Sequence, residues 1–406
     1  MLDYKKISIF LALFAINNIV YFTPSFGNEY YIVMFLGLVL LLRNGSCQIY
    51  PVTAGFIAVS AMSIMANTIP AVYNPWVRLL TFCVVLSVAG PLLRGAFYDK
   101  SKVIMFWTLR WGMVLVAFLS FLARIFGGGK VQNNNFYCGI TVHSVTMGLI
   151  AADALIFTFF FFLQNGLRSK YRKIYLAGIL INFILLLSSA SRGAAMAGLG
   201  GSFLMLYLLL KGSASKNIRV LIILGIVLFS TFPLWRSSLE ALEKKNKGLT
   251  SLNLETREEH WKYLFELFSD NPVLGVGFSY LPDLNDSFVE KGSDGRGQVE
   301  PGNSWLVILS MTGLLGGISI GAILTLTFMQ LKRQYQLHRQ RTALLSGLLF
   351  CEILHMCGEG YILAAGGFGF FNFWCLLGAI WAFTHLDKTP QNEKLFGRYS
   401  DYIMAA

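Results

Sequence analysis

The sequence predicts an all-α, polytopic integral membrane protein with about twelve transmembrane helices. Hydrophobic residues make up 55% of the 406 residues and charged residues only 13%, a composition outside the range of soluble globular domains. Apolar runs of about 20 residues recur along the chain, and apart from the shorter run 29–42 they are long enough to cross a hydrocarbon core of about 30 Å. Basic residues cluster in every second connection between these runs, as expected for cytoplasmic connections.

The predicted spans follow one another through short connections, apart from a single long one. In chain order they are 7–25, 29–42, 51–68, 76–93, 103–123, 139–163, 173–190, 193–210, 218–235, 303–330, 342–363 and 366–385. Lys5 and Lys6 precede the first span, and basic residues recur after every second one, so both termini are predicted to be cytoplasmic. The first apolar run has no small-residue cleavage site and is interpreted as a retained anchor.

The long connection, residues 236–302, is predicted to lie on the exported side. It holds twelve acidic and eight basic residues, a net charge of −4, whereas the whole chain carries +12. The positive charge therefore belongs to the cytoplasmic connections and gives no support for nucleic-acid binding. The chain divides into spans 1 to 9 (residues 1–235), this large loop (236–302), spans 10 to 12 (303–385) and a cytoplasmic tail (386–406).

The long connection carries two helical patterns. A short helix is predicted over 237–246, and a second is predicted to begin at a Thr256 cap and to end at 270–272, where the sequence reads Asp-Asn-Pro. In the second helix, apolar residues at helical spacing form one face, which we expect to lie on the membrane surface or on the bundle: Trp261, Leu264, Phe265 and Phe268. The polar, glycine-rich segment that follows is interpreted as a flap.

Cysteines and histidines form no metal-ligand pattern in the sequence. The six cysteines include no CxxC pair and mostly lie in or beside apolar spans, which favours buried thiols over a disulfide framework. The five histidines show no HExxH or similar spacing, and no nucleotide-binding glycine loop is found. We therefore expect neither a metal nor a nucleotide cofactor, and an ATP-driven pump is disfavoured.

Several ionisable residues lie within or beside predicted spans or in the outer loop, where they call for an explanation. Arg192 falls in a very short outer turn, where it either snorkels or, with the serines around it, binds an anion such as phosphate. Arg257, in the long loop, is either solvated or anion-binding, and His143, near the outer end of the sixth span, is either a packing histidine or a catalytic one. Arg110 and Asp153 lie inside neighbouring spans and are expected to pair.

Three stretches, in this order, carry a family resemblance. They read "SSASRGAAMAG" between two spans, "TREEHWKYLFELFSDNPVLGVGF" in the long connection and "PGNSWLVILSMTGLLG" at the opening of the next span. Together they resemble the signatures of the O-antigen ligase and O-antigen polymerase superfamily. That pattern is Ser-Arg-Gly, then Arg with Trp four residues on and Asn-Pro-x-x-Gly-x-Gly, then a lip that usually reads His-Asn-Ser/Thr. The resemblance covers about residues 130 to 330.

This resemblance implies a GT-C-like glycosyltransferase of the bacterial inner membrane that takes a glycan from undecaprenyl pyrophosphate on the periplasmic face. The lipid-linked glycan is the substrate, and neither a cofactor nor a metal is implied. By motif position, Arg192 and Arg257 bind the pyrophosphate, because guanidinium donors stabilise the charge of such a leaving group. The residues implied to support the site are Ser191, Trp261, Asn303 and Ser304. The implied partners are membrane lipids and a chain-length regulator and flippase of the same pathway, with no nucleic acid.

The sequence departs from the family pattern at the lip, where Gly302 stands in place of the usual His. Glycine cannot activate an acceptor hydroxyl, so Glu300 and His143 become the candidates for a general base. Glu300 has a second interpretation, as a helix-entry residue favoured by the helix dipole.

The missing His favours an enzyme that polymerises repeat units of a surface polysaccharide over a ligase that transfers the glycan to lipid A-core. Two rival classes remain: a polysaccharide flippase or transporter, which also has about twelve spans, and a structural or assembly partner of an envelope complex. The gathering of polar residues at one face, rather than at the membrane midplane, favours an enzyme.

Overall fold

The computed structural model describes residues 3–23, 28–43, 47–67, 74–132, 136–164, 171–210, 252–279, 289–291, 297–299 and 302–387. The predicted span 218–235, the predicted helix 237–246, most of the predicted flap, Glu300 and the tail from residue 388 lie outside these ranges. Arg257 lies within a described helix, but its side chain is not among the described ones.

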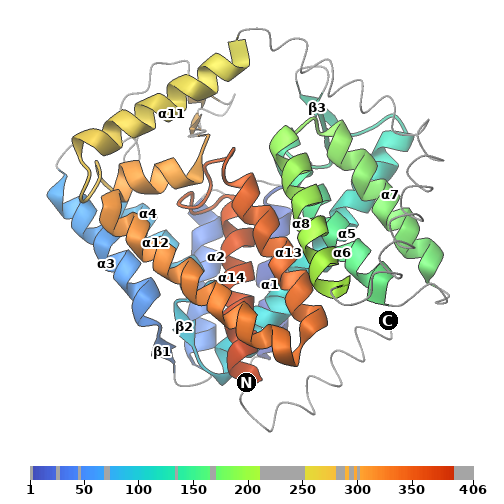
Figure 1. The fold of residues 1–406 in the computed structure, drawn as a ribbon, viewed down its shortest axis with the longest axis horizontal. Helices are drawn as coiled ribbons and strands as arrows, with labels where there is room; N and C mark the ends of the chain where they lie inside the picture. Colours follow the sequence, from blue (N-terminus) through green and yellow to red (C-terminus); the bar gives the residue numbers. More distant parts are fainter. Residues whose placement is uncertain are drawn as a thin grey trace.

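The described chain is largely helical, which confirms the all-α prediction (Figure 1). The helices are α1 (Tyr4–Asn17), α2 (Asn28–Leu42), α3 (Pro51–Ala66), α4 (Pro75–Val88), α5 (Ala96–Ile125), α6 (Ser144–Gln164), α7 (Arg172–Ser188), α8 (Arg192–Leu210), α11 (Leu252–Asp270), α12 (Ser304–Leu337), α13 (Arg339–His355) and α14 (Phe368–Leu386). The strands are β1 (Gln48–Ile49), β2 (Leu93–Arg94), β3 (Lys130–Gln132), β4 (Phe136–Gly139), β5 (Val289–Lys291) and β6 (Gly297–Val299). They form three antiparallel pairs, β1 with β2, β3 with β4 and β5 with β6.

Each predicted span other than 218–235 coincides with a described helix, and α5, α6, α8, α12 and α14 are long and apolar enough to cross a membrane. Several predicted bounds are wrong. α1 ends at Asn17 because the chain then turns, and Val20 pairs with Thr141 in a β-bridge. α6 begins at Ser144 rather than 139 because Gly139 ends β4 and Thr141 then pairs with Val20. α11 begins at Leu252, so the predicted Thr256 cap lies inside the helix, whereas its predicted end at Asp270 is confirmed.

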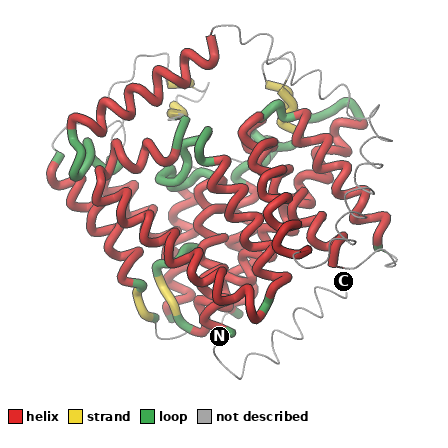
Figure 2. The backbone as a smooth tube through the Cα atoms, in the orientation of Figure 1, coloured by secondary structure: helices red, strands yellow, loops and turns green. Residues whose placement is uncertain are grey.

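The bundle has two distinct ends (Figure 1). The end that we call the α11 end carries α11, the β3–β4 hairpin and the turn between α7 and α8. The opposite end, called the N-terminal end, carries the start of α1, the β1–β2 pair and the end of α14. Figure 2 shows the loop between α13 and α14 in the middle of the α11 end, between α11 and the β3–β4 hairpin.

The core is packed with apolar side chains, and helices cross closely where glycines face each other. α14 is apolar on all sides and largely buried, with Phe370, Phe371 and Trp374 fully enclosed, as expected for a central helix. Where α8 crosses α13, a Cβ added at Gly201 would lie 2.5 Å from the carbonyl oxygen of Gly347. Small residues at such a crossing let two membrane helices approach until their backbones touch.

A chain of buried polar side chains links four of these helices. Arg110 of α5 forms an ion pair with Asp153 of α6, which confirms the predicted pairing. Asn372 of α14 donates one hydrogen bond to Asp153, at 2.7 Å, and another to Glu352 of α13. Glu352 also accepts a hydrogen bond from the hydroxyl of Tyr361 at 2.6 Å. Charges buried this deeply are stable only with such partners.

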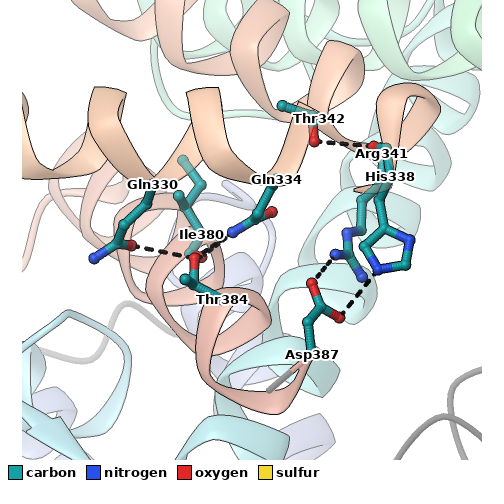
Figure 3. Close-up of polar contacts among 8 residues, drawn as sticks. All are labelled: Gln330, Gln334, His338, Arg341, Thr342, Ile380, Thr384 and Asp387. Carbon is teal, nitrogen blue, oxygen red and sulfur yellow. Dashed lines mark hydrogen bonds and ion pairs between the residues drawn. The ribbon is translucent and has the colours of Figure 1, made fainter. Parts of the chain in front are cut away.

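Polar contacts at the N-terminal end tie the turn between α12 and α13 to the end of α14 (Figure 3). Gln334 donates to the carbonyl oxygen of Ile380 at 3.0 Å. Asp387 forms an ion pair with Arg341 and lies 3.6 Å from Nε2 of His338. These contacts hold the C-terminal part of α12 in place. The N-terminus of α12 lies at the α11 end of the bundle.

Candidate functional site

α7 and α8 meet in a tight turn formed by residues 188–191, which we call the serine turn. Ala190 in this turn has φ +51°, a left-handed conformation that is uncommon for residues other than glycine. Ser191 caps α8, because its hydroxyl oxygen accepts the N–H of Ala194 at 3.4 Å. Arg192 is the first residue of α8. The turn therefore holds Arg192 at a helix N-terminus, where the helix dipole favours an anion.

The serine hydroxyls build the turn. Ser188 donates to the carbonyl oxygen of Ile184 at 2.6 Å and Ser189 to that of Leu186 at 2.7 Å, and both serines are buried. An anion at this turn would therefore meet the guanidinium of Arg192 and the N–H groups that open α8 rather than the serine hydroxyls. A Cβ added at Gly193, the next residue of α8, would meet nothing within 4 Å.

A second arginine, Arg124 at the end of α5, reaches the same turn. Its guanidinium donates a hydrogen bond to the hydroxyl of Ser188 and lies over the ring of Tyr137, 5.4 Å from the ring centroid. Burial raises the pKa of Tyr137 to about 12, so its hydroxyl stays protonated and donates to the carbonyl oxygen of Ser120 at 2.6 Å. The β3–β4 hairpin thus supports Arg124 from one side and the serine turn holds it from the other.

His143 lies at the N-terminus of α6, at the same end of the bundle. Its Nδ1 accepts the backbone N–H of Val145 at 3.2 Å, and its Nε2 lies 3.0 Å from the side-chain amide of Gln132. One turn further along α6, a Cβ added at Gly148 would lie 2.9 Å from the Ser189 hydroxyl oxygen, so the start of α6 packs directly on the serine turn. The geometry favours a capping and positioning role for His143.

The lip, residues 302–304 at the start of α12, forms a second cluster of polar contacts. The side-chain oxygen of Asn303 accepts the N–H groups of Trp305 and Leu306 at 2.9 and 3.1 Å, which makes it the N-cap of α12. Its amide donates to the carbonyl oxygen of Cys357 at 3.0 Å, and the hydroxyl of Ser304 donates to that of Glu359 at 2.6 Å. Asn303 and Ser304 therefore fasten the lip to the loop between α13 and α14.

α11 lies across this lip. The indole N–H of Trp261 donates to the carbonyl oxygen of Gly302 at 3.2 Å. Gly302 has φ +66°, and a Cβ added to it would lie 3.6 Å from Trp261 Nε1 and 3.9 Å from Nδ1 of His260. The apolar face predicted for α11 is only partly covered, because Leu264 is buried whereas Trp261 and Phe265 are exposed.

The second and third motifs form one structural joint. α12 breaks at Gly313, where φ is +64°, and the segment 272–277 is inserted beside the break. The N–H groups of Leu314 and Leu315 donate to the carbonyl oxygens of Pro272 and Val273, at 2.8 and 3.3 Å. In return, the N–H groups of residues 276 and 277 donate to the carbonyl oxygens of residues 310 and 311, at 2.8 and 3.2 Å. The inserted segment thus pairs with backbone groups that the break in α12 would otherwise leave without partners.

The glycines of this joint are needed for contact as well as for conformation. A Cβ added at Gly275 would lie 2.4 Å from the backbone carbon of Met311, and one at Gly313 would lie 2.2 Å from the carbonyl oxygen of Val273. Ser63 of α3 donates to Met311 O at 2.8 Å and so closes the joint from a third helix. The joint sets the direction in which the upper part of α12, and with it the lip, leaves the bundle.

The structure places the predicted site residues at one end of the bundle, in two groups on either side of the α13–α14 loop (Figures 1 and 2). One group holds His143, Ser191 and Arg192, and the other holds Trp261, Asn303 and Ser304. Arg257 belongs to α11 one turn before Trp261, and Glu300 lies outside the described residues.

Two residues of these groups escaped the sequence reasoning. One feature of the sequence could have indicated Arg124. It is a basic residue just after the exported end of the predicted span 103–123, and Arg is disfavoured on that side. His260 is adjacent in sequence to a motif residue, but its approach to Gly302 depends on how α11 crosses the lip.

Comparison with known proteins agrees with the motifs. Residues 177–321 match the family model described as O-antigen ligase, and this range contains all three motifs. A search among curated proteins gave no match. The resemblance to the O-antigen ligase and O-antigen polymerase superfamily is confirmed, and it points to a membrane glycosyltransferase-like function.

Proposed function

We propose that this chain, whose residues 177–321 match the O-antigen ligase family, polymerises undecaprenyl-pyrophosphate-linked oligosaccharide repeat units of a surface polysaccharide. The observation that carries the proposal is the serine turn, which places Arg192 at the N-terminus of α8 and accepts a hydrogen bond from Arg124 through Ser188. The reaction takes place at the α11 end, which faces the periplasm of a bacterium, while the N-terminal end of the bundle faces the cytoplasm.

Glycosyl transfer from a lipid pyrophosphate requires stabilisation of the leaving group. The bond between the anomeric carbon and the pyrophosphate oxygen breaks, and its electron pair passes to the pyrophosphate. Guanidinium groups aimed at these oxygens stabilise the developing charge, and they stay protonated throughout. In this proposal Arg192 and Arg257 contact the pyrophosphate, and Arg124 holds the serine turn while adding positive charge next to it.

Gly302 favours polymerisation over ligation. The proposal assigns transfer to the growing chain on a second lipid carrier, because the lip lacks the imidazole that the family pattern places there. The left-handed backbone at Gly302 supports this assignment, since a side chain at this position would be strained. The runner-up is a ligase that transfers the glycan to lipid A-core. In the polymerase assignment, the partners are the lipid-linked glycan, the flippase that supplies it and a chain-length regulator.

Replacing the arginines tests the enzyme. In a strain lacking the native gene, Arg192→Ala and Arg257→Ala should abolish long-chain glycan while the protein still accumulates in the membrane fraction. Arg339→Ala is the matched control, because Arg339 lies at the N-terminal end and donates to the Leu208 carbonyl oxygen at 3.0 Å. Normal chain length in both the Arg192 and the Arg257 variants would refute the proposal.

The nature of the product separates polymerase from ligase. In a strain that lacks the lipid A-core acceptor, a polymerase still accumulates long glycan on undecaprenyl pyrophosphate. A ligase accumulates no polymer of its own making in such a strain, and its product appears only when the acceptor is restored. Dependence of the product on lipid A-core would therefore assign the chain to the ligases.

A further inference from the structure

We propose that His260 is the general base of this glycosyl transfer, an inference that rests on the proposed function. The imidazole accepts the proton of the acceptor hydroxyl as its oxygen bonds to the anomeric carbon. The bond from that carbon to the pyrophosphate oxygen breaks, and the electron pair leaves with the pyrophosphate. The proton remains on His260 until it passes to water or to the released pyrophosphate, so the step is balanced without a further reactant.

The first observation is the position of the imidazole at the lip. Nδ1 of His260 lies 3.9 Å from the point that a Cβ on Gly302 would occupy. The half-buried ring of His260 therefore stands beside the backbone that opens α12. The neighbouring Trp261 holds α11 at this distance, because its indole donates to the Gly302 carbonyl oxygen at 3.2 Å.

The second observation is the backbone of Gly302 itself. With φ +66°, this position is suited to glycine, and a histidine here would strain the chain. A base at this point of the lip must therefore come from another element. Among the described residues, α11 brings an imidazole to it, and imidazole is the side chain best suited to exchange a proton near neutral pH.

The third observation concerns the register of α11. Positions 257 and 260 are three residues apart in one helix, so they stand on the same face, one turn from each other. Arg257 is the arginine to which the proposed function assigns the pyrophosphate. The proposal therefore places the base one helical turn from a leaving-group ligand, with the anomeric carbon between them.

His143, the histidine that the sequence suggested for this role, is engaged differently. Its Nδ1 accepts the N–H of Val145 at 3.2 Å, and its Nε2 lies 3.0 Å from the side-chain amide nitrogen of Gln132. Both ring nitrogens serve the cap of α6 and its contact with β3. His143 is therefore a positioning residue for the serine turn, whereas His260 stands at the lip.

The test uses the full-length protein in membrane vesicles supplied with an undecaprenyl-pyrophosphate-linked repeat unit, with polymer and released lipid pyrophosphate as readouts. His260→Gln should lower turnover by about 100-fold or more, the usual contribution of a general base. The acidic limb of the kcat/KM profile of the wild type should disappear in this variant. In His260→Gly, added imidazole should restore part of the lost turnover, which a merely structural role would not allow.

The controls separate this inference from the proposed function. His338→Gln removes a histidine at the N-terminal end, where it lies near Asp387, and should leave turnover and its pH profile unchanged. If His260→Gln keeps wild-type turnover while Arg192→Ala abolishes it, the assignment of His260 is wrong and the glycosyltransferase remains. If Arg192→Ala and Arg257→Ala also keep wild-type turnover, the proposed function itself is wrong. A loss in His260→Gly that imidazole does not restore, with an unchanged pH profile in His260→Gln, also refutes the assignment.

Discussion

Arg124 donates a hydrogen bond to the hydroxyl of Ser188, a residue 64 positions later in the chain. This contact joins the end of α5 to the turn that presents Arg192. It gives the candidate pyrophosphate site a second cation that no motif marks. The serine turn is therefore a composite of α5, α6, α7 and α8, although its own residues are consecutive in sequence.

The role of Arg124 can be measured by two substitutions. We expect Arg124→Ala to lower glycan polymerisation by about tenfold to a hundredfold, because the turn loses both a hydrogen bond and a nearby positive charge. Arg124→Lys keeps the charge but lacks the planar donor set, so it should recover only part of the activity. The measurement is initial rate in membrane vesicles. Equal rates for wild type and Arg124→Ala would exclude Arg124 from the site.

The joint between the second and third motifs should be intolerant of any side chain. Gly275→Ala and Gly313→Ala each place a Cβ within 2.4 Å of backbone atoms at a left-handed position. The backbone conformation alone should cost about 1–3 kcal/mol, and the clash adds to it. We expect lower thermal unfolding midpoints in detergent for both variants.

Gly321 provides a matched control in the same helix. A Cβ added there would meet nothing within 4 Å, and its backbone is helical, so Gly321→Ala should be neutral or slightly stabilising. If Gly275→Ala and Gly321→Ala unfold at the same temperature, the interlocked joint is not formed in solution.

Asn303 has two separable roles at the lip. Asn303→Ala removes both the cap of α12 and the hydrogen bond to Cys357, and we expect a loss of about 1 kcal/mol together with lower activity. Asn303→Asp keeps an oxygen that caps the helix but cannot donate to the Cys357 carbonyl oxygen. Stability close to wild type with reduced activity in Asn303→Asp would indicate that the tie to the α13–α14 loop orients the lip. Full activity in both variants would contradict a role for the lip.

The buried polar chain predicts strong coupling between α5 and α6. Arg110→Met leaves the buried Asp153 carboxyl without its cation, and the expected loss of stability is about 3–5 kcal/mol. The double variant Arg110→Met with Asp153→Leu removes both charges and should recover part of this loss. Unfolding in detergent, analysed as a double-mutant cycle, gives the coupling directly. Additive effects would show that the two side chains do not form a pair.

Parts of the site that depend on local sequence were predictable. The cap at Asn303 needs only a short polar residue before an apolar run, and the end of α11 at Asp270 needs only the following Asn-Pro. The pairing of Arg110 with Asp153 followed from the energetic cost of burying either charge alone. By contrast, α6 was predicted to begin too early, at residue 139, because Gly139 belongs to β4, which pairs with β3, and Thr141 forms a β-bridge with Val20.

What the sequence determined by itself was the membrane class, the approximate positions of most described helices and the three motifs, because hydrophobic length and local capping are properties of contiguous residues. Only the tertiary structure decided that segment 272–277 fills the break at Gly313, that Arg124 reaches the serine turn and that His260 stands against Gly302. Each of these relationships joins residues from different elements. Helix crossing and backbone close approach set such distances, and no spacing along the chain encodes them.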